Sequence, residues 1–192
     1  MAKTNLTKEL EKRIYKATSK QGVFCCFEVT IGWFGTERVD YITYDTNDVW
    51  RCYEIKVTKS DFHSKAHTTF VGNYNYYVMP EKLYEQVKSE IPDHVGVYVG
   101  EKCVKRAKRQ ELSVDSQILK NSLIRSLSRD SEALMKLNDP NYINKLKTRI
   151  KKLESENQKI RRKYFDLYYQ YKKICMKNGE EPSFNLDNDL FD

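Results

Sequence analysis

The chain has 192 residues, of which 40% are hydrophobic and 32% charged, and its formal net charge is +7. This length suggests one core domain with appendages rather than two full domains. Apolar runs fall far short of the ~20 residues that a membrane span needs, so we expect no membrane partner. A pI near 9.0 favours contact with phosphate backbones or other anionic surfaces, although it says nothing about the fold.

The cysteines and the first residues bear on the compartment. Residues 1–20 are charged and contain no apolar signal-peptide core. The cysteines are odd in number and show no CxxC spacing, which predicts reduced thiols and a cytoplasmic location. Zinc is not expected, because no histidine lies at a ligand spacing from a cysteine pair.

The first half of the chain predicts a helix followed by three strands. Apolar residues recur at helical steps over residues 4–19. Residues 23–34, 37–44 and 49–57 are rich in β-branched and aromatic residues, which is typical of strands. The Asp-Thr-Asn-Asp turn at 45–48 is short, so the three strands should form an antiparallel meander.

The following segment predicts further elements of the same domain: a short helix near 60–66, a strand at 74–79, a helix at 80–90, and strands at 95–99 and 102–107. A meander followed by crossover strands indicates an α/β fold with a mixed sheet flanked by helices. We therefore assign residues 1–110 to this domain and residues 111–138, which look helical without one apolar stripe, to a connector.

An acid–lysine set lies in the second and third predicted strands. Glu54 and Lys56 are two residues apart, so they should point to the same face of the third strand, with Ile55 on the other. Asp40 lies in the preceding strand, and hairpin register would bring it beside Glu54. Taken alone, a Glu-x-Lys triplet more often marks an exposed face with a cross-strand ion pair.

Two carboxylates and a lysine are suited to phosphodiester hydrolysis. Carboxylate oxygens bind Mg²⁺, which usually keeps several waters. The metal polarises a phosphoryl oxygen and acidifies a bound water. An ammonium group can orient that water or neutralise developing charge.

Asp40 followed after a hairpin by Glu54-x-Lys56 resembles the signature of the PD-(D/E)XK nuclease superfamily. The sequence downstream resembles the MmcB-like branch of DNA repair proteins. The resemblance lies in Ser60-Asp61-Phe62, in Lys65 and in residues 74–80 and 91–97. The resemblance covers residues 4–107. Val39 departs from it, since the superfamily name expects proline there.

The resemblance implies a restriction-endonuclease-like fold and a set of roles. Asp40 and Glu54 would be ligands of Mg²⁺ or Mn²⁺, and Lys56 the catalytic lysine. The first helix of this superfamily often adds a glutamate, for which Glu11 is preferred here and Glu9 is nearly as good. A solvated helix face is the competing reading for either glutamate.

Basic residues in two places are candidates for DNA contact. His63 and Lys65 follow the third strand, where they would either touch phosphate or decorate a helix face. A denser cluster follows the last strand, and an edge strand protected by lysines is the alternative there. This basic cluster comprises Lys102, Lys105, Arg106, Lys108 and Arg109.

The C-terminal part predicts a coiled coil over residues 139–178, with Asp139 and Pro140 at the helix start. Hydrophobic residues alternate at three- and four-residue steps for about five heptads, which exceeds what is normally required. The alternative is a single long helix that packs on its own domain. One heptad position holds Ile143, Ile150, Asn157, Tyr164 and Tyr171, and the other holds Leu146, Leu153, Ile160, Leu167 and Ile174.

Polar residues in the heptads favour a parallel homodimer. Asn157 at a core position favours a two-stranded parallel partner. Arg149 would face Glu154 of the other copy, and Glu156 would face Arg161. Residues 179–192 are acidic and are expected to be a disordered tail.

The leading hypothesis is a Mg²⁺-dependent endonuclease that acts on DNA in bacterial or phage DNA repair or processing as a homodimer. The alternative is an inactive nuclease-fold module that binds DNA or protein, such as a phage-encoded inhibitor, and recruits a partner through its coiled coil.

Overall fold

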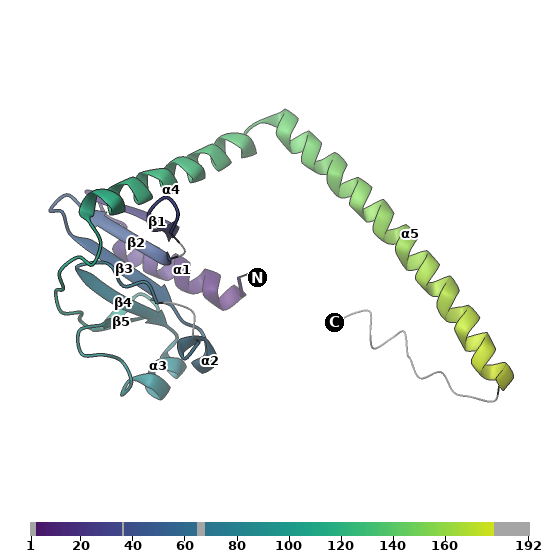
Figure 1. The fold of residues 1–192 in the computed structure, drawn as a ribbon, viewed down its shortest axis with the longest axis horizontal. Coiled ribbons are helices and arrows are strands. Elements are labelled where there is room, and N and C mark those ends of the chain that lie inside the picture. The colour runs from purple at the N-terminus through teal and green to yellow at the C-terminus, as the bar shows by residue number, and fades with distance from the viewer. Residues whose placement is uncertain (1–2, 36, 65–67, 179–192) are drawn as a thin grey trace. The chain divides into compact units, whose positions relative to one another are not determined.

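The computed structural model of the chain describes residues 3–35, 37–64 and 68–178 (Figure 1). It divides into two units, Met1–Glu132 and Ala133–Asp192. The elements are α1 (Asn5–Thr18), β1 (Val23–Thr30), β2 (Arg38–Asp45), β3 (Trp50–Ile55), α2 (Lys59–Phe62), β4 (Tyr74–Met79), α3 (Glu81–Val87), β5 (Gly96–Val99), β6 (Lys102–Lys105), α4 (Ser116–Leu137) and α5 (Pro140–Asn178).

The first unit is built on one six-stranded mixed sheet in the order β1-β2-β3-β4-β5-β6. The first three strands pair antiparallel, β3, β4 and β5 pair parallel, and β6 returns antiparallel. The predicted meander and mixed α/β class are therefore confirmed. Asp45 makes the tight β2–β3 turn possible, because its carboxylate accepts hydrogen bonds from the N–H groups of Asn47 and Val49.

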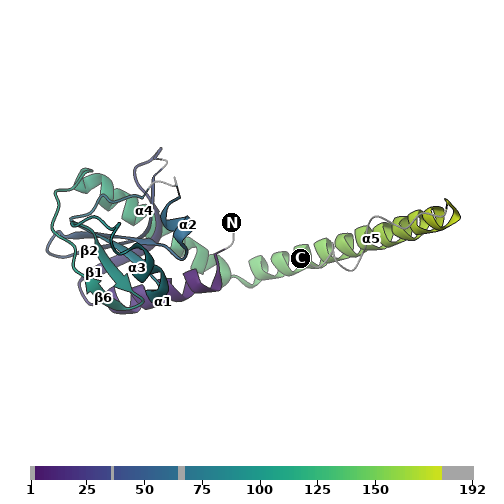
Figure 2. The same ribbon diagram turned by 90° about the horizontal axis from the view of Figure 1, so that it is seen from below.

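Helices cover both faces of the sheet (Figure 2). On one face, Leu10 and Ile14 of α1 pack against Tyr41 and Tyr53. On the other face, α4 packs its leucines against a cluster that contains Trp50 and Cys52, and α3 adds a third cluster around Met79. Strand side chains point alternately to the two faces, and helices cover both faces. Side chains that a ligand can reach therefore lie at the ends of the strands.

The start of α4 belongs to the first unit, which differs from the predicted separate connector at 111–138. Its buried positions are Leu119, Ser122, Leu123 and Ser126, which fall on one helical face. Two of these four residues are serine, so the apolar stripe was not visible in the sequence. Through Glu132 this helix is part of the sheet-bearing unit.

The predicted first strand, 23–34, is too long. β1 ends at Thr30, and the chain then turns at Gly32, whose φ of +74° is a conformation that glycine adopts without strain. The N–H of Ile31 donates to the carbonyl of Glu37 across the loop. The aromatic residues Trp33 and Phe34 therefore lie in a loop and not in the sheet.

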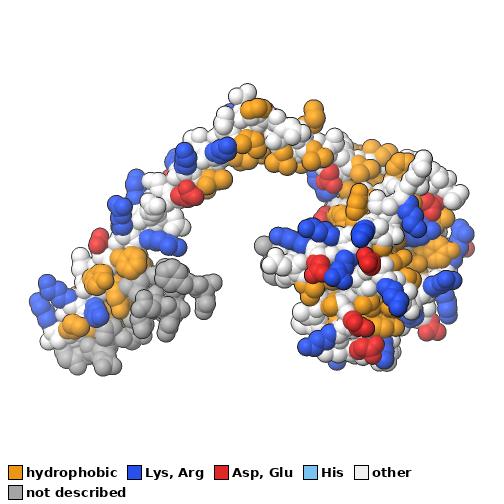
Figure 3. All heavy atoms as spheres, turned by 180° about the vertical axis from the view of Figure 1, so that it is seen from behind, with side chains coloured by type: hydrophobic (Ala, Val, Ile, Leu, Met, Phe, Trp, Pro, Cys, Tyr) orange, Lys and Arg blue, Asp and Glu red, His pale blue; other side chains and the backbone are white. Residues whose placement is uncertain are grey.

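The helix α5 spans 39 residues, in agreement with the predicted C-terminal helix. Figure 3 shows hydrophobic side chains on the surface of this helix. Several heptad residues are exposed in the single chain, among them Ile150 at 53%, Leu153 at 48% and Ile160 at 67%. The predicted acidic tail, 179–192, lies outside the described residues. Within the described part of the chain, no helix is long and apolar enough to cross a membrane.

Candidate active site

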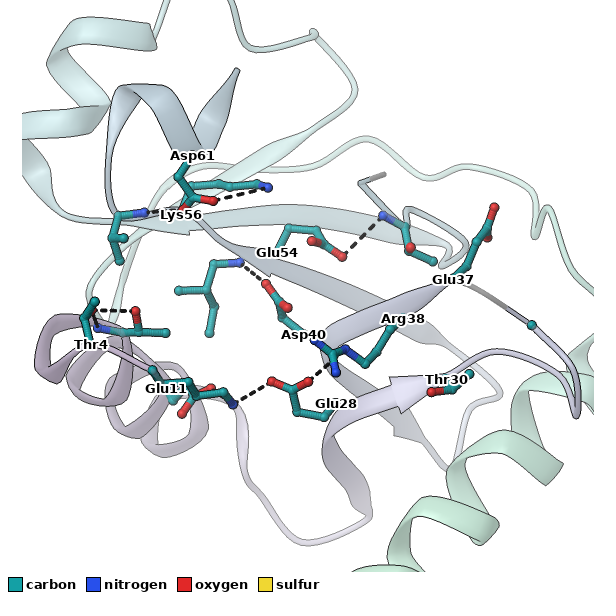
Figure 4. Close-up of a pocket in the computed structure, with 16 residues that line it drawn as sticks. Thr4, Glu11, Glu28, Thr30, Glu37, Arg38, Asp40, Glu54, Lys56 and Asp61 are labelled. Carbon is teal, nitrogen blue, oxygen red and sulfur yellow. Dashed lines mark hydrogen bonds and ion pairs between the residues drawn. The ribbon is translucent and has the colours of Figure 1, made fainter. Parts of the chain in front are cut away.

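A cleft of about 1030 Å³ lies where β1, β2 and β3 have one of their ends (Figure 4). Antiparallel pairing brings the end of β1, the start of β2 and the end of β3 together at this place. The N-cap and the first two turns of α1 add Thr4, Thr7 and Glu11 to the wall of the cleft. The cleft is thus formed by segments that meet only because of the meander.

The three central residues of the predicted set, Asp40, Glu54 and Lys56, all line this cleft. The register pairs Tyr41 with Tyr53, so the next step places Asp40 opposite Glu54. The Asp40 carboxylate also accepts a hydrogen bond of 2.9 Å from the N–H of Ile55. The predicted convergence of the two acids and the lysine is therefore present in the structure.

The Glu54 carboxyl is buried, with 3% of the residue exposed. Burial, and then the nearby charge of Asp40, raise its pKa to about 8, against a lowering contribution from Lys56. Burial also raises the pKa of Asp40, although the hydrogen bond from Ile55 opposes this. Two adjacent, desolvated carboxyl groups thus resist ionisation together, which is the electrostatic environment that a bound cation would relieve.

Lys56 is buried to a similar degree, with 5% of the residue exposed. Its Nζ lies 4.0 Å from Oδ1 of Asp61, while Oδ2 of Asp61 accepts a 3.0 Å hydrogen bond from the N–H of Val57. Thr58 caps α2 by accepting from the N–H of Asp61. The short helix α2 therefore fixes an acid beside the lysine, and this pair is not part of the predicted set.

Of the two candidate glutamates of the first helix, Glu11 faces the cleft. Glu9 forms an ion pair with Arg13 and is not a lining residue. The ammonium of Lys3 lies 2.5 Å from a carboxylate oxygen of Glu11 and 2.7 Å from one of Glu28. The helical phase of α1 thus selects Glu11, the preferred of the two.

Glu28 was not identified from the sequence. It is the one charged residue in β1, its φ is +55°, and the register places it opposite Asp40. Arg38 contacts its carboxylate at 2.8 Å. A non-glycine residue in this backbone region is uncommon and strained, and such strain collects at functional sites. The one signal in the sequence was an acid inside an otherwise uncharged strand.

Thr69 was also missed. It is 2% exposed, lines the cleft, and donates its N–H to Oε1 of Glu54 at 3.3 Å. Its hydroxyl has no hydrogen-bond partner among the described residues. A buried hydroxyl without a hydrogen bond lowers stability, so buried polar groups in proteins normally have a hydrogen-bond partner. The sequence offered no signal for it, because its place depends on a parallel crossover.

The structure does not bring the predicted DNA-contacting residues to the cleft. Nε2 of His63 lies 2.6 Å from a carboxylate oxygen of Glu90, within hydrogen-bond distance. Lys105 donates to the carbonyls of Ile91 and Pro92. The basic cluster Lys102, Lys105, Arg106, Lys108 and Arg109 lies on or directly after β6, at the sheet edge farthest from β1, and none of these residues lines the cleft. Lys65 lies outside the described residues.

The residues present fit a hard divalent cation. Within the described ranges, no three His, Cys, Asp or Glu side chains are grouped closely enough to form a metal site as they stand. Mg²⁺ nevertheless needs only one or two carboxylates, since it retains several waters. Asp40 and Glu54 supply two such oxygen donors in a place where burial raises the pKa of both carboxyl groups.

The fold and the cleft define the class of protein. It is a mixed-sheet α/β domain with two acids and a lysine where β2 starts and β3 ends. Comparison with protein-family models gives no match, and comparison with curated proteins gives none either. A solved structure described as the SPO1766 protein of unknown function from Silicibacter pomeroyi is similar, with a TM-score of 0.57 and 15% identity, covering 73% of this chain and 96% of that chain. At this identity the likeness concerns the fold alone.

Proposed function

We propose that the chain is a metal-dependent phosphodiesterase of the PD-(D/E)XK type that cleaves DNA. The observation behind the proposal is the meeting of Asp40, Glu54 and Lys56 in one cleft, two of them almost fully buried. Burying ionisable groups is costly, so the burial of Glu54 and Lys56 beside Asp40 supports a chemical use for them.

Each residue has a distinct role in this proposal. Asp40 and Glu54 would hold Mg²⁺ or Mn²⁺, and the hydrogen bond from Ile55 keeps Asp40 in the orientation for doing so. When bound, the cation would polarise the scissile phosphoryl group and acidify a water. Lys56 supplies a fixed positive charge for orienting that water and neutralising charge that develops on the phosphate. Asp61 positions the lysine from the other side.

We further propose that two copies pair through α5. The exposed face of the helix carries Leu146, Ile150 and Leu153, which would gain burial in a parallel pair. Asn157 lies among them at a core position. A paired enzyme would present two clefts to a duplex, one for each strand.

The test is cleavage of DNA substrates in the presence of Mg²⁺ or Mn²⁺ by the full-length protein and by Asp40→Asn, Glu54→Gln and Lys56→Met. These substitutions keep side-chain size, and thermal unfolding verifies the fold of each. Glu85→Gln, an exposed acid that pairs with Lys88 on α3, is the matched control. All three site variants should lose cleavage while the control retains it.

Two outcomes would count against the proposal. Cleavage that survives in every site variant would assign the activity elsewhere. DNA binding with no metal-dependent cleavage of any substrate would favour the alternative of a nuclease-fold binding module.

A further inference from the structure

The loop between β1 and β2 exposes two adjacent aromatic side chains. Trp33 is 75% exposed and Phe34 is 100% exposed. Single exposed apolar residues are ordinary, but two neighbouring rings in solvent at a loop tip are less so. The position of this loop, which we call the aromatic loop (residues 31–35), suggests what covers them.

The aromatic loop is held in place by α4. The hydroxyl of Ser122 accepts a 3.0 Å hydrogen bond from the N–H of Gly32. The guanidinium of Arg125 donates to the carbonyl of Gly32 at 2.8 Å and to that of Thr30 at 2.5 Å. Its carbon lies 5.3 Å from the centre of the Trp33 ring. The rings are therefore presented on an anchored backbone, which lowers the entropy lost when a ligand binds.

The aromatic loop and its flanks border the catalytic cleft. Gly35 of the loop lines that cleft, as do Thr30 and Glu37 on the two flanking segments. Figure 4 shows Thr30 and Glu37 beside Arg38, at the side of the cleft where the hairpin turns. Trp33 and Phe34 therefore directly precede a residue of the cleft wall.

Trp33 also lines a second space, a shallow groove of about 590 Å³ along α4. The helix contributes Ile124, Arg125 and Arg129 to this groove. Arg129 pairs with Asp130 and donates to the carbonyls of Phe27 and Glu28, whereas Arg125 is the arginine that contacts the loop. Glu132 also lines the groove, so the charge of the groove is mixed. Exposed aromatic side chains on a held backbone are typical of surfaces that bind single-stranded nucleic acid, because unpaired bases stack on them.

We propose that Trp33 and Phe34 stack on unpaired bases of the nucleic acid whose backbone lies in the cleft, while Arg125 holds the loop that carries them in place. This inference rests on the proposed nuclease function and specifies its substrate class. The substrate is DNA with unpaired bases beside the cleavage point, such as a single strand, a flap or a junction. A fully paired blunt duplex offers no base faces to the loop.

The chain contains its own reporter for this interaction. Of its two tryptophans, Trp50 is fully buried and Trp33 is exposed, so a change in tryptophan emission on titration reports on the aromatic loop. The full-length protein is titrated in EDTA, where no cleavage occurs, with oligothymidylate and with a blunt duplex of equal length. Oligothymidylate should quench the emission strongly, and the duplex should do so weakly.

Substitutions then test affinity directly, by anisotropy of a labelled oligothymidylate. Phe34→Ala should weaken binding about tenfold, and Trp33→Ala about tenfold or more, as expected for the loss of one stacked base. The matched control is Phe24→Ala, which removes a 51% exposed ring from the other end of β1 and should bind as the wild type does.

The outcomes separate this inference from the nuclease proposal. Quenching and Phe34-dependent affinity in a protein that cleaves nothing would support the loop and overturn the nuclease. Unchanged emission at saturating nucleic acid, or equal affinity of Phe34→Ala and wild type, would overturn the loop proposal even in an active enzyme, and would leave a protein partner as its occupant.

Discussion

The Asp40 carboxylate accepts a 2.9 Å hydrogen bond from the backbone N–H of Ile55, the residue that separates Glu54 from Lys56. This bond ties the acid of β2 to the strand that carries both other members of the set. Because it uses one oxygen and runs to the main chain, it is independent of the side chain at position 55. It also gives Asp40 a structural role that can be separated from its proposed chemical one.

We expect Asp40→Asn and Asp40→Ala to differ in stability but not in activity. Asparagine retains an acceptor for the Ile55 N–H, whereas alanine leaves that partly buried donor unpaired, so only alanine should lower the free energy of unfolding, by about 1–3 kcal/mol. Both should reduce cleavage by roughly 10²–10³-fold, because both remove a charge from the reaction centre. Denaturant unfolding and single-turnover cleavage measure the two effects. Equal stability of the two variants would show that the hydrogen bond contributes little.

Glu11 and Glu9 form a natural matched pair on α1. Glu11→Gln should slow cleavage by about 10- to 100-fold, as expected for a group that orients a metal site. Glu9→Gln should leave cleavage unchanged, since Glu9 pairs with Arg13 and does not line the cleft. Rates of the two variants at saturating Mg²⁺ decide the matter. The reverse order of effects would mean that the helical phase has been misassigned.

The raised pKa of Glu54 predicts how stability depends on pH in the metal-free protein. The folded chain holds this proton more tightly than the unfolded chain, so the free energy of unfolding should fall as the pH rises from about 4.5 towards about 8. Glu54→Gln has no such proton and should be the more stable protein at pH 8, by roughly 1–3 kcal/mol. Saturating Mg²⁺ should raise the free energy of unfolding of the wild type at pH 8 but not that of Glu54→Gln.

The measurement is denaturant unfolding of both proteins in EDTA at pH 5 and pH 8, repeated with Mg²⁺. The gap between them should be small at the lower pH and large at the higher one. Parallel pH profiles for wild type and Glu54→Gln would show that this carboxyl does not titrate as proposed.

Thr69→Val should stabilise the protein while impairing it. The hydroxyl is buried without a partner among the described residues, so an isosteric methyl should raise the free energy of unfolding by about 1 kcal/mol. If the hydroxyl holds a water or a phosphate oxygen beside Glu54, cleavage should fall about tenfold in the same variant. A stabilised variant of full activity would assign Thr69 no part in the reaction.

The pairing of α5 can be tested by mass. Light scattering should give twice the 22.8 kDa of one chain for the wild type. Leu153→Glu should give the mass of a single chain, because a charge at a core heptad position prevents burial. Ser155→Glu, two residues further along and outside the heptad core, is the control. If the wild type has the mass of one chain, the homodimer proposal is wrong, and the exposed heptad residues would have to bind another partner.

Local pattern alone was enough to predict the order of the strands, the hairpin turn at 45–48 and the long C-terminal helix. These features depend on alternation, turn residues and heptads, which are short-range properties of the chain. The prediction that Glu54 and Lys56 point to the same face of the sheet follows from the same alternation. The face of α4 was missed, because serines at positions 122 and 126 interrupt its apolar stripe and only packing shows that they are buried.

Burial and proximity, in contrast, were decided by the tertiary structure. The raised pKa of Glu54 depends on desolvation by neighbours distant in sequence, and Glu28 and Thr69 enter the cleft through strand register and a parallel crossover. The basic cluster after β6 was predicted either to extend a phosphate-binding surface or to protect an edge strand, and only the strand order shows that it lies on the side of the sheet away from β1. The sequence states which ionisable residues the chain contains. Which other residues surround each of them depends on which strands become neighbours in the sheet.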